Sequence, residues 1–368
     1  MNSTSFTPFQ TPSARPAASA VRVTTPAPLE VWRDLHRHDP ESLLTQSPEW
    51  LECLRASGGY RDASRLYEFA SGQQLLTPLV ERKGLPRRLA VGASWPYAWG
   101  IGGVLARREP SPEELRAVFA DLSKHFFSLN LTPNPLRGDL WREAAPRGVT
   151  AVPRREHVLD LEGGFETVWR ERFKSKTRNK VRKAQKLGVE VQSDSSGALV
   201  PVFYDLFRRS VDRWAEQQSE PRWLSHLRTS RRDPLSKFEH IARILGDACR
   251  VHVAWHEGQP VAAIIVLLGA NNADYIRGAM DKDLAGPVNA NDLLHSVATE
   301  EACAAGCRYY HMGESAWSKN LSSFKERFGA RAYEHREYRL ERLPLSRADR
   351  ALREVVKRLI GFEDQSGV

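Results

Sequence analysis

The segment from Arg170 to Lys186, RERFKSKTRNKVRKAQK, constrains this chain most strongly. Nine of its seventeen residues are Lys or Arg, and only Glu171 is acidic. An apolar stripe with a spacing of mostly four runs through and just before it, at Phe165, Trp169, Phe173, Val181 and Ala184. This spacing predicts a helix with one face packed on a core. Cations crowded on the other faces repel one another until an anion binds, so the segment predicts a polyanion-binding helix. A solvated basic face is the alternative.

The whole chain is basic, with 54 Lys and Arg against 45 Asp and Glu and a net charge of +9 in 368 residues. This balance favours nucleic acid, a phosphorylated substrate or an anionic membrane surface as partner, without choosing among them. Four scattered cysteines are too few for a disulfide framework, which indicates a reducing, cytoplasmic location. No apolar run approaches the roughly 18 to 20 residues that span a bilayer.

Both ends of the chain differ in composition from the rest. Residues 1–28 contain five prolines among Ser, Thr and Ala and lack the apolar core of a secretory signal, so we expect a flexible leader. Residues 344–368 form a predicted basic amphipathic tail. Its apolar residues, three or four apart, are Leu345, Ala348, Leu352, Val355 and Leu359. Such a tail predicts either peripheral contact with an anionic membrane or a helix packed on the protein itself.

Between these ends the patterns predict an α/β protein with two lobes, at 29–150 and 151–343. The first lobe has two expected strands, at 64–70 and 74–82. A capping box at 111–114 opens its firmest helix, whose buried stripe is Leu115, Val118, Phe119, Leu122 and Phe126. Residues 132–147, with three prolines, read as a loop crossing between the lobes.

The second lobe has a clearer order: a strand, helices that include the basic one, a three-strand meander, a helix, a strand, a helix and a strand. The expected meander strands are 249–256, 260–268 and 274–280, the following helix is 291–305, and the last three elements are 308–312, 320–328 and 331–341.

This order resembles the core of the GNAT acyltransferase fold, and the first lobe resembles a degenerate copy of it. The basic helix matches a motif of the FemAB-like transferases at Lys176, Arg178, Asn179, Arg182, Lys183, Ala184, Lys186, Gly188 and Val189. A second segment, Phe324 to Gly329, is similar to the F-K-x-x-F-G of that family. The resemblance implies two GNAT-like lobes, each with a mixed, mostly antiparallel sheet flanked by helices. It also implies transfer of an amino acid from aminoacyl-tRNA onto an amine of a peptidoglycan precursor. The long coiled-coil arm of the best-known members is absent from this sequence.

Acyl transfer to an amine requires a neutral amine, a stabilised oxyanion and a proton for the leaving group. The resemblance places Lys325 against the transferred acyl group, where its ammonium would stabilise the oxyanion; a surface lysine is the alternative. Glu314, His311 and Asp281 are the candidates for accepting the amine proton, each with a structural role as the alternative. No Ser or Cys nucleophile motif is present, and we expect neither a metal nor a bound cofactor.

Cations on the basic helix are the candidates for binding phosphate, together with two residues of the last meander strand. They are Lys176, Arg178, Lys180, Arg182, Lys183, Tyr275 and Arg277. The junction 281–292 has one glycine, a proline and three acids, unlike the glycine-rich turn that holds coenzyme A pyrophosphate in ordinary GNAT enzymes. Carboxylates repel a pyrophosphate and proline lacks an amide donor, so the junction disfavours acyl-CoA.

Three functions therefore remain. The first is an aminoacyltransferase that uses aminoacyl-tRNA, with a phosphorylated or lipid-linked acceptor. The second is a GNAT-type N-acyltransferase that uses an acyl thioester. The third is a non-catalytic protein that binds nucleic acid or a membrane.

Overall fold

The computed structural model describes residues 21–315 and 318–343. The first half contains two sets of short strands and four helices. Its strands are β1 (Val21–Thr24), β2 (Tyr60–Asp62), β3 (Arg65–Phe69), β4 (Gln74–Thr77), β5 (Val80–Arg82), β6 (Val91–Ala93) and β7 (Ser128–Leu131). Its helices are α1 (Leu29–His38), α2 (Pro48–Ala56), α3 (Pro112–His125) and α4 (Gly138–Ala144), with single turns η1 (Leu44–Gln46), η2 (Arg87–Leu89) and η3 (Pro135–Arg137). The predicted leader thus contains strand β1 near its end, and the predicted C-terminal tail lies outside the described residues.

The second half has longer strands and more helices. Its strands are β8 (Thr150–Asp160), β9 (Glu190–Asp194), β10 (Cys249–His256), β11 (Gln259–Leu268), β12 (Asn272–Met280), β13 (Tyr309–Glu314) and β14 (Arg331–Glu341). Its helices are α5 (Gly164–Thr167), α6 (Ser175–Lys186), α7 (Val200–Gln217), α8 (Arg222–Arg232), α9 (Leu235–Leu245), α10 (Lys282–Val288), α11 (Ala290–Ala304) and α12 (Lys319–Glu326). Two further turns are η4 (Val168–Arg172), a π-helix, and η5 (Gly246–Ala248).

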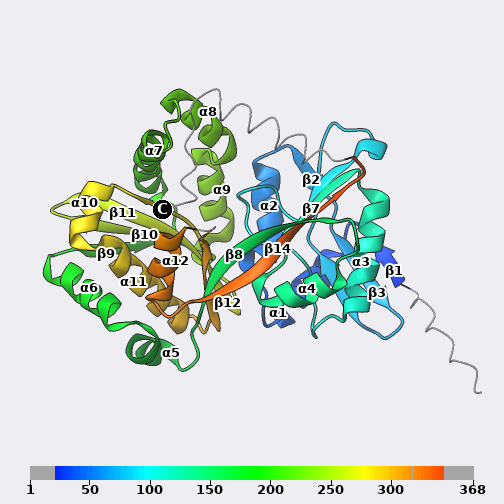
Figure 1. Ribbon diagram of the computed structural model, residues 1–368, viewed down its shortest axis with the longest axis horizontal. Coiled ribbons are helices and arrows are strands. Elements are labelled where there is room, and N and C mark those ends of the chain that lie inside the picture. Colours follow the sequence, from blue (N-terminus) through cyan, green and yellow to red (C-terminus); the bar gives the residue numbers. More distant parts are fainter. Residues whose placement is uncertain (1–20, 316–317, 344–368) are drawn as a thin grey trace, which may run out of the picture.

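In the described chain, eleven strands form one sheet in the order β2-β5-β6-β7-β14-β8-β13-β12-β11-β10-β9. A smaller antiparallel sheet contains β1, β3 and β4. Neighbouring strands of the large sheet are antiparallel except for β6–β7 and β12–β13, which are parallel. Helices flank the sheets (Figure 1), which confirms the mixed α/β class.

The last strand of the second half completes the sheet of the first half. Strand β8 begins the second half and pairs with β13, where Leu159 lies opposite Tyr310. Strand β14 ends the second half but pairs with β7, where Tyr338 lies opposite Leu131. The two long strands also pair with each other and cross the centre of the molecule (Figure 1). Backbone hydrogen bonds therefore join the halves into one sheet.

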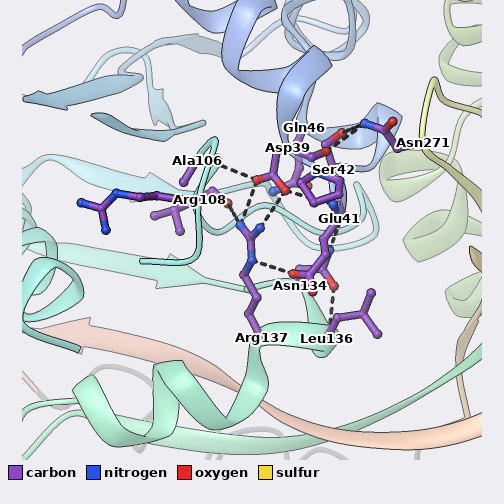
Figure 2. Close-up of polar contacts among 12 residues, drawn as sticks. Asp39, Glu41, Ser42, Gln46, Ala106, Arg108, Asn134, Leu136, Arg137 and Asn271 are labelled. Carbon is purple, nitrogen blue, oxygen red and sulfur yellow. Dashed lines mark hydrogen bonds and ion pairs between the residues drawn. The ribbon is translucent and has the colours of Figure 1, made fainter. Parts of the chain in front are cut away.

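A buried ion-pair network holds the loop after α1 against the second half (Figure 2). Asp39 is fully buried and accepts hydrogen bonds from Arg137 Nη1 and Nη2, at 2.9 and 2.7 Å, and from the amide of Ala106 at 2.9 Å. Arg137 Nε also lies 2.6 Å from a carboxylate oxygen of Glu41. From the end of the β11–β12 turn, Asn271 Nδ2 donates to the Asp39 carbonyl at 2.9 Å. The network thus fixes first-half backbone beside the start of β12.

The helix α3 forms as its sequence predicts. Ser111 Oγ accepts from the Glu114 amide at 3.2 Å, and a Glu114 carboxylate oxygen accepts from the Ser111 amide at 2.8 Å. The predicted stripe is buried, with all five apolar side chains at most 5% exposed. The capping box and the apolar period together therefore specify this helix.

Three local expectations are wrong. The basic segment is two helices, because η4 ends at Arg172 and the Lys174 amide donates to the Arg327 carbonyl at 2.9 Å before α6 begins. The region 132–147 is not a plain loop, since it contains η3 and α4, whose Trp141 is buried against Tyr338. The expected strand 74–82 is β4 and β5, which lie in different sheets.

Candidate active site

The site lies where the parallel strands β12 and β13 separate. They pair from Asn272 opposite Tyr309 to Asp274 opposite His311, and no further. Beyond this point β12 stays paired with β11, whereas β13 turns at Gly313, which has a φ of +78°. A parallel pair that opens in this way leaves carbonyl groups on the inner side of β13 without a strand partner.

Lys325 supplies the partner for two of these carbonyl groups. Its Nζ, on α12, donates to the Gly313 carbonyl at 2.6 Å and to the Glu314 carbonyl at 2.9 Å. The residue is only 5% exposed, and this burial lowers the pKa of Lys325 to about 8, although Glu156 and Glu314 favour the charged form. A protonated amine has three donors, so one remains for another acceptor. The two carbonyl groups therefore hold the Lys325 ammonium in position before a substrate binds.

The two sequence motifs, far apart in the chain, form one structural unit beside this lysine. Thr177 Oγ1, at the start of α6, donates to the Arg327 carbonyl at 2.9 Å. Phe173 and Phe328 pack edge to face with ring centroids 5.0 Å apart. Gly329 has a φ of +85°, and a Cβ there would lie 2.6 Å from the Arg172 carbonyl oxygen. Only glycine fits so close an approach, which explains why the F-K-x-x-F-G segment ends in this residue.

Acid and base groups from three strands share one face of the sheet at the point of separation. His311 lies opposite both Asp274 on β12 and Val158 on β8, and Glu156 is two residues from Val158, so all three polar side chains face the same way. His311 Nδ1 is 3.1 Å from a Glu156 carboxylate oxygen. Burial, with the nearby Glu156, raises the pKa of Asp274 to about 7. Asp274 can therefore exchange a proton near neutral pH.

His311 is thus a member of this row, whereas Asp274 and Glu156 were not predicted. Glu156 is buried; burial raises its pKa, but the bond from His311 and the charges of His311, His335 and Lys325 together lower its pKa by more. His335 on β14 lies opposite Arg154, which puts it on the same face, and burial lowers its pKa. In the sequence, Asp274 and Glu156 resemble the ordinary polar positions of strands in which polar and apolar residues alternate. Only the register between the strands brings the two acids together.

The other two proton-acceptor candidates are more exposed than the row: Glu314 lies opposite Glu156 at its end, and Asp281 lies just after β12. Glu314 is about two-fifths exposed, and its carboxylate is paired with Arg154 Nη1 at 3.2 Å, while its carbonyl group binds Lys325. Asp281 accepts from the amides of Asp283 and Leu284 at 3.2 and 3.3 Å, which caps α10. The assignment of either as a base stays a prediction.

Tyr275 and Arg277 extend from β12 beside the row. The Tyr275 ring packs edge to face on His295, with centroids 5.0 Å apart, and burial raises its pKa to about 12, so its hydroxyl stays protonated. Arg277 Nη2 donates to Asp233 at 2.8 Å, and Asp233 is fully buried. Arg277 therefore already has an anionic partner, while Tyr275 lies at the separation point.

Two of the predicted phosphate-binding cations on α6 have partners within the protein. Arg178 Nη1 donates to the carbonyl groups of Arg170, at 3.0 Å, and Trp169, at 3.2 Å, and also to that of Phe173, so it binds the end of η4. Lys180 Nζ is 3.7 Å from Asp292.

The other cations on α6 remain available to a ligand. Arg182 is exposed and stacks over Trp169 at 5.6 Å. Lys176 and Lys183 are exposed, and in the described chain neither has a carboxylate oxygen within 4 Å. These three side chains are exposed cations on the helix whose Thr177 binds the segment after Lys325.

The structure supports neither a metal centre nor a membrane span among its described residues. No group of three or more His, Cys, Asp or Glu in residues 21–315 and 318–343 is placed to hold a metal ion. No helix in the same ranges is long and apolar enough to cross a bilayer.

Residues 171–326 match the family described as acetyltransferase (GNAT) domain, a range that contains α6, the separating strands and Lys325. The sequence matches none of the curated proteins. Among solved structures, the crystal structure of FemX aligns with a TM-score of 0.57 at 12% identity, covering 87% of this chain and 97% of FemX. This likeness shows a common fold.

Two further structures align over similar lengths with lower scores. One is the C-terminal domain of a putative lysylphosphatidylglycerol synthetase from Agrobacterium fabrum, with a TM-score of 0.48 at 14% identity, covering 89% of this chain and 96% of that one. The other is a tandem GNAT protein from the clavulanic acid biosynthesis pathway, with a TM-score of 0.43 at 12% identity, covering 87% and 97%.

Proposed function

This chain is a GNAT-superfamily acyltransferase with FemAB-like architecture, and from this premise we propose that it transfers an aminoacyl group from aminoacyl-tRNA onto an amine of a cell-wall precursor or a similar acceptor. As an acyltransferase it is an enzyme, so the non-catalytic alternative is set aside. The observation that carries the proposal is Lys325, a buried ammonium held by two carbonyl groups at the separation of β12 and β13.

In the proposed reaction Lys325 stabilises the oxyanion. The acceptor amine attacks the ester carbonyl carbon, a C–N bond forms, and the carbonyl oxygen becomes negative. The remaining N–H of Lys325 donates to this oxygen. Because the ammonium is buried and already positioned, its stabilisation of the developing charge is stronger than in water.

The row on β12, β13 and β8 provides the proton acceptor. A neutral amine gains a positive charge as it attacks, and Asp274 takes the released proton. With a pKa of about 7, Asp274 is substantially deprotonated at neutral pH. His311, held by Glu156, lies beside it and favours the carboxylate form. When the ester C–O bond breaks, the leaving ribose oxygen takes its proton from Lys325.

The junction after β12 supports an aminoacyl-tRNA donor over coenzyme A. The first amides of α10 are bound by the Asp281 carboxylate, and the buried Asp292 lies in the first turn of α11. Carboxylates at these positions repel a pyrophosphate. On α6, the exposed Lys176, Arg182 and Lys183 offer cations for a nucleic-acid backbone.

One observation favours the acyl-thioester alternative. The helices between β9 and β10 do not project as an arm, since α7 packs on β11 and β12 and α9 packs on α2 and β10. An enzyme of this shape has less surface for tRNA than family members with a coiled-coil arm.

The test compares donors directly. Purified protein is given a UDP-sugar-linked peptide as the amine acceptor and either radiolabelled aminoacyl-tRNA or acetyl-CoA, and transfer of label is measured. We expect transfer from aminoacyl-tRNA, and loss of that transfer when the tRNA is treated with ribonuclease. Transfer from acetyl-CoA alone would establish the thioester alternative and contradict the proposed donor.

A further inference from the structure

Helix α8 has two of its three large apolar residues on the outside, while Leu224 is partly buried. Trp223 is 69% exposed and Leu227, one turn further along the same face, is 43% exposed. The residues that α8 buries are small and polar: Ser225 is 2% exposed and Thr229 is 7% exposed. An ordinary surface helix has the opposite arrangement, with apolar residues against the core.

Polar contacts, not an apolar face, hold α8 on the protein. Arg228 makes a two-pronged contact with Glu220, at 2.7 and 2.8 Å. His226 Nε2 lies 2.7 Å from a carboxylate oxygen of Asp212 on α7. Trp223 and Leu227 are therefore not needed for docking the helix and are left for another surface.

Positive charge predominates around these side chains, although Arg222 is paired with the exposed Glu216. Helix α8 contains four arginines and no acid. Glu220, beneath Arg228, has a side chain only 2% exposed, while Arg228 itself is half exposed. Arg231 is exposed and, in the described chain, has no acidic partner within 4 Å. The outer side of α8 thus combines apolar groups with a net positive charge, because Arg228 and Arg231 have no exposed acid as a partner in the described chain.

A second aromatic side chain extends this surface at the end of α8. Tyr97, from the first half, is 75% exposed, and the guanidinium of Arg232 lies 5.9 Å from the centre of its ring. Tryptophan and tyrosine beside arginine are typical of the interface between water and lipid, where an apolar ring is buried and a polar tip stays hydrated.

We propose that the outer face of α8, with Trp223, Leu227 and Arg231, together with Tyr97, binds an anionic lipid surface. The positive charge of α8 favours an anionic lipid surface over the two other candidate partners, a second copy of the chain and the C-terminal segment. A second copy of the chain would place the same arginines against each other, and the C-terminal segment, with Arg347, Arg350 and Arg353, is also basic. Anionic headgroups instead attract each nearby Arg, by about 1 kcal/mol, while the rings enter the headgroup region.

The surface is connected to the site through buried charges. Asp233, directly after α8, binds Arg232 at 2.6 Å and Arg277 of β12 at 2.8 Å. A membrane bound at α8 therefore has a fixed position relative to the strand that carries Asp274. This inference does not depend on which acyl donor is used.

Cosedimentation of the full chain with vesicles tests the proposal. Binding is measured with phosphatidylcholine vesicles and with vesicles containing one-third phosphatidylglycerol, for wild type and for a Trp223→Gln/Leu227→Gln variant. A Leu85→Gln/Leu89→Gln variant is the matched control, because these two leucines are similarly exposed beside Arg87 and Arg88. We expect the α8 variant to bind anionic vesicles at least tenfold more weakly, and the control to bind normally.

Folding and the competing partners are measured on the same samples. The α8 variant should keep the wild-type melting temperature, and binding should be weak with phosphatidylcholine alone. The proposal is overturned if the α8 variant binds like wild type, or if both variants lose binding equally. It is equally overturned if a chain ending at Leu343 loses all binding, or if sedimentation velocity shows that the α8 substitutions dissociate a dimer.

Discussion

At the scale of residues, the proposed acyl transfer depends on two ionisable groups whose burial shifts their pKa towards neutrality. Lys325 and Asp274 have pKa values of about 8 and 7, moved from opposite directions by the same desolvation. The sequence predicts Lys325 through its motif, but it offers no comparable sign of Asp274 or Glu156. Both acids lie in alternating strands, and their proximity depends on the register of β8, β12 and β13.

The pH dependence of kcat/KM should be a narrow bell. Asp274 acts deprotonated, so activity rises as pH increases through about 7. Lys325 acts protonated, so activity falls as pH increases through about 8. Initial rates at subsaturating acceptor, between pH 5 and 10, report these limbs for the free enzyme. A flat profile across pH 6 to 9 would rule out both roles.

Replacing Asp274 with Asn should remove the acid limb of the pH profile, which is the rise in kcat/KM through about pH 7. We expect turnover to fall by roughly a hundredfold or more, since a positioned base contributes that order of rate. The remaining activity should no longer rise through pH 7. Glu314→Gln is the comparison, because Glu314 is exposed and its carboxylate is paired with Arg154. If Glu314→Gln loses the acid limb and Asp274→Asn keeps it, the base is Glu314.

At the scale of elements, the contact between the start of α6 and the segment after α12 explains what the two motifs do. Each motif predicts its own helix, but neither predicts that Gly329 lies against the backbone of Arg172. The break before α6 could not be predicted because it is caused by the distant Arg327 carbonyl, not by a local breaker. Helix α8 has no inward apolar stripe, so periodicity cannot reveal it.

The exposed cations of α6 should contribute to the salt dependence of tRNA binding. Replacing Lys176 and Lys183 with Glu should flatten the slope of log affinity against log salt by about 0.7 to 0.9 for each phosphate that the variant no longer binds. These lysines are better positions to substitute than Arg178, because Arg178 binds three carbonyl groups of the protein and its loss would also disturb the fold. Filter binding between 50 and 300 mM salt measures the slope, with Arg87→Glu/Arg88→Glu as the matched control. An identical change in both variants would indicate a non-specific charge effect.

At the scale of the whole molecule, the pairing of β14 with both β7 and β8 makes the two halves interdependent. The order of elements in the sequence predicts two lobes, but it cannot predict that the final strand pairs with β7, because strand pairing at long range leaves no local pattern. Tyr338 illustrates the result: it belongs to the last strand but is fully buried against Phe119 and Trp141 of the first half. Each half therefore lacks part of its core without the other.

Replacing Tyr338 with Ala should destabilise both halves together. Loss of a buried aromatic ring costs about 3 to 5 kcal/mol, and the shared sheet should transmit this loss as one unfolding transition at lower temperature. Scanning calorimetry checks this, with the exposed Arg336→Ala on the same strand as control. Two separate transitions in the variant would contradict the interdependence of the halves.

The central claim is that Lys325 stabilises the transition state of acyl transfer. Its most direct test is the single-turnover rate of acyl transfer for wild type, Lys325→Met and Lys319→Met, an exposed lysine on the same helix. Burial has lowered the pKa of Lys325, so its charged form costs stability below about pH 8, and we expect the methionine variant to stay folded. The account predicts a rate at least a hundredfold lower for Lys325→Met, with acceptor binding unchanged and Lys319→Met near wild type. A Lys325→Met enzyme that stays folded and turns over at close to the wild-type rate would contradict it.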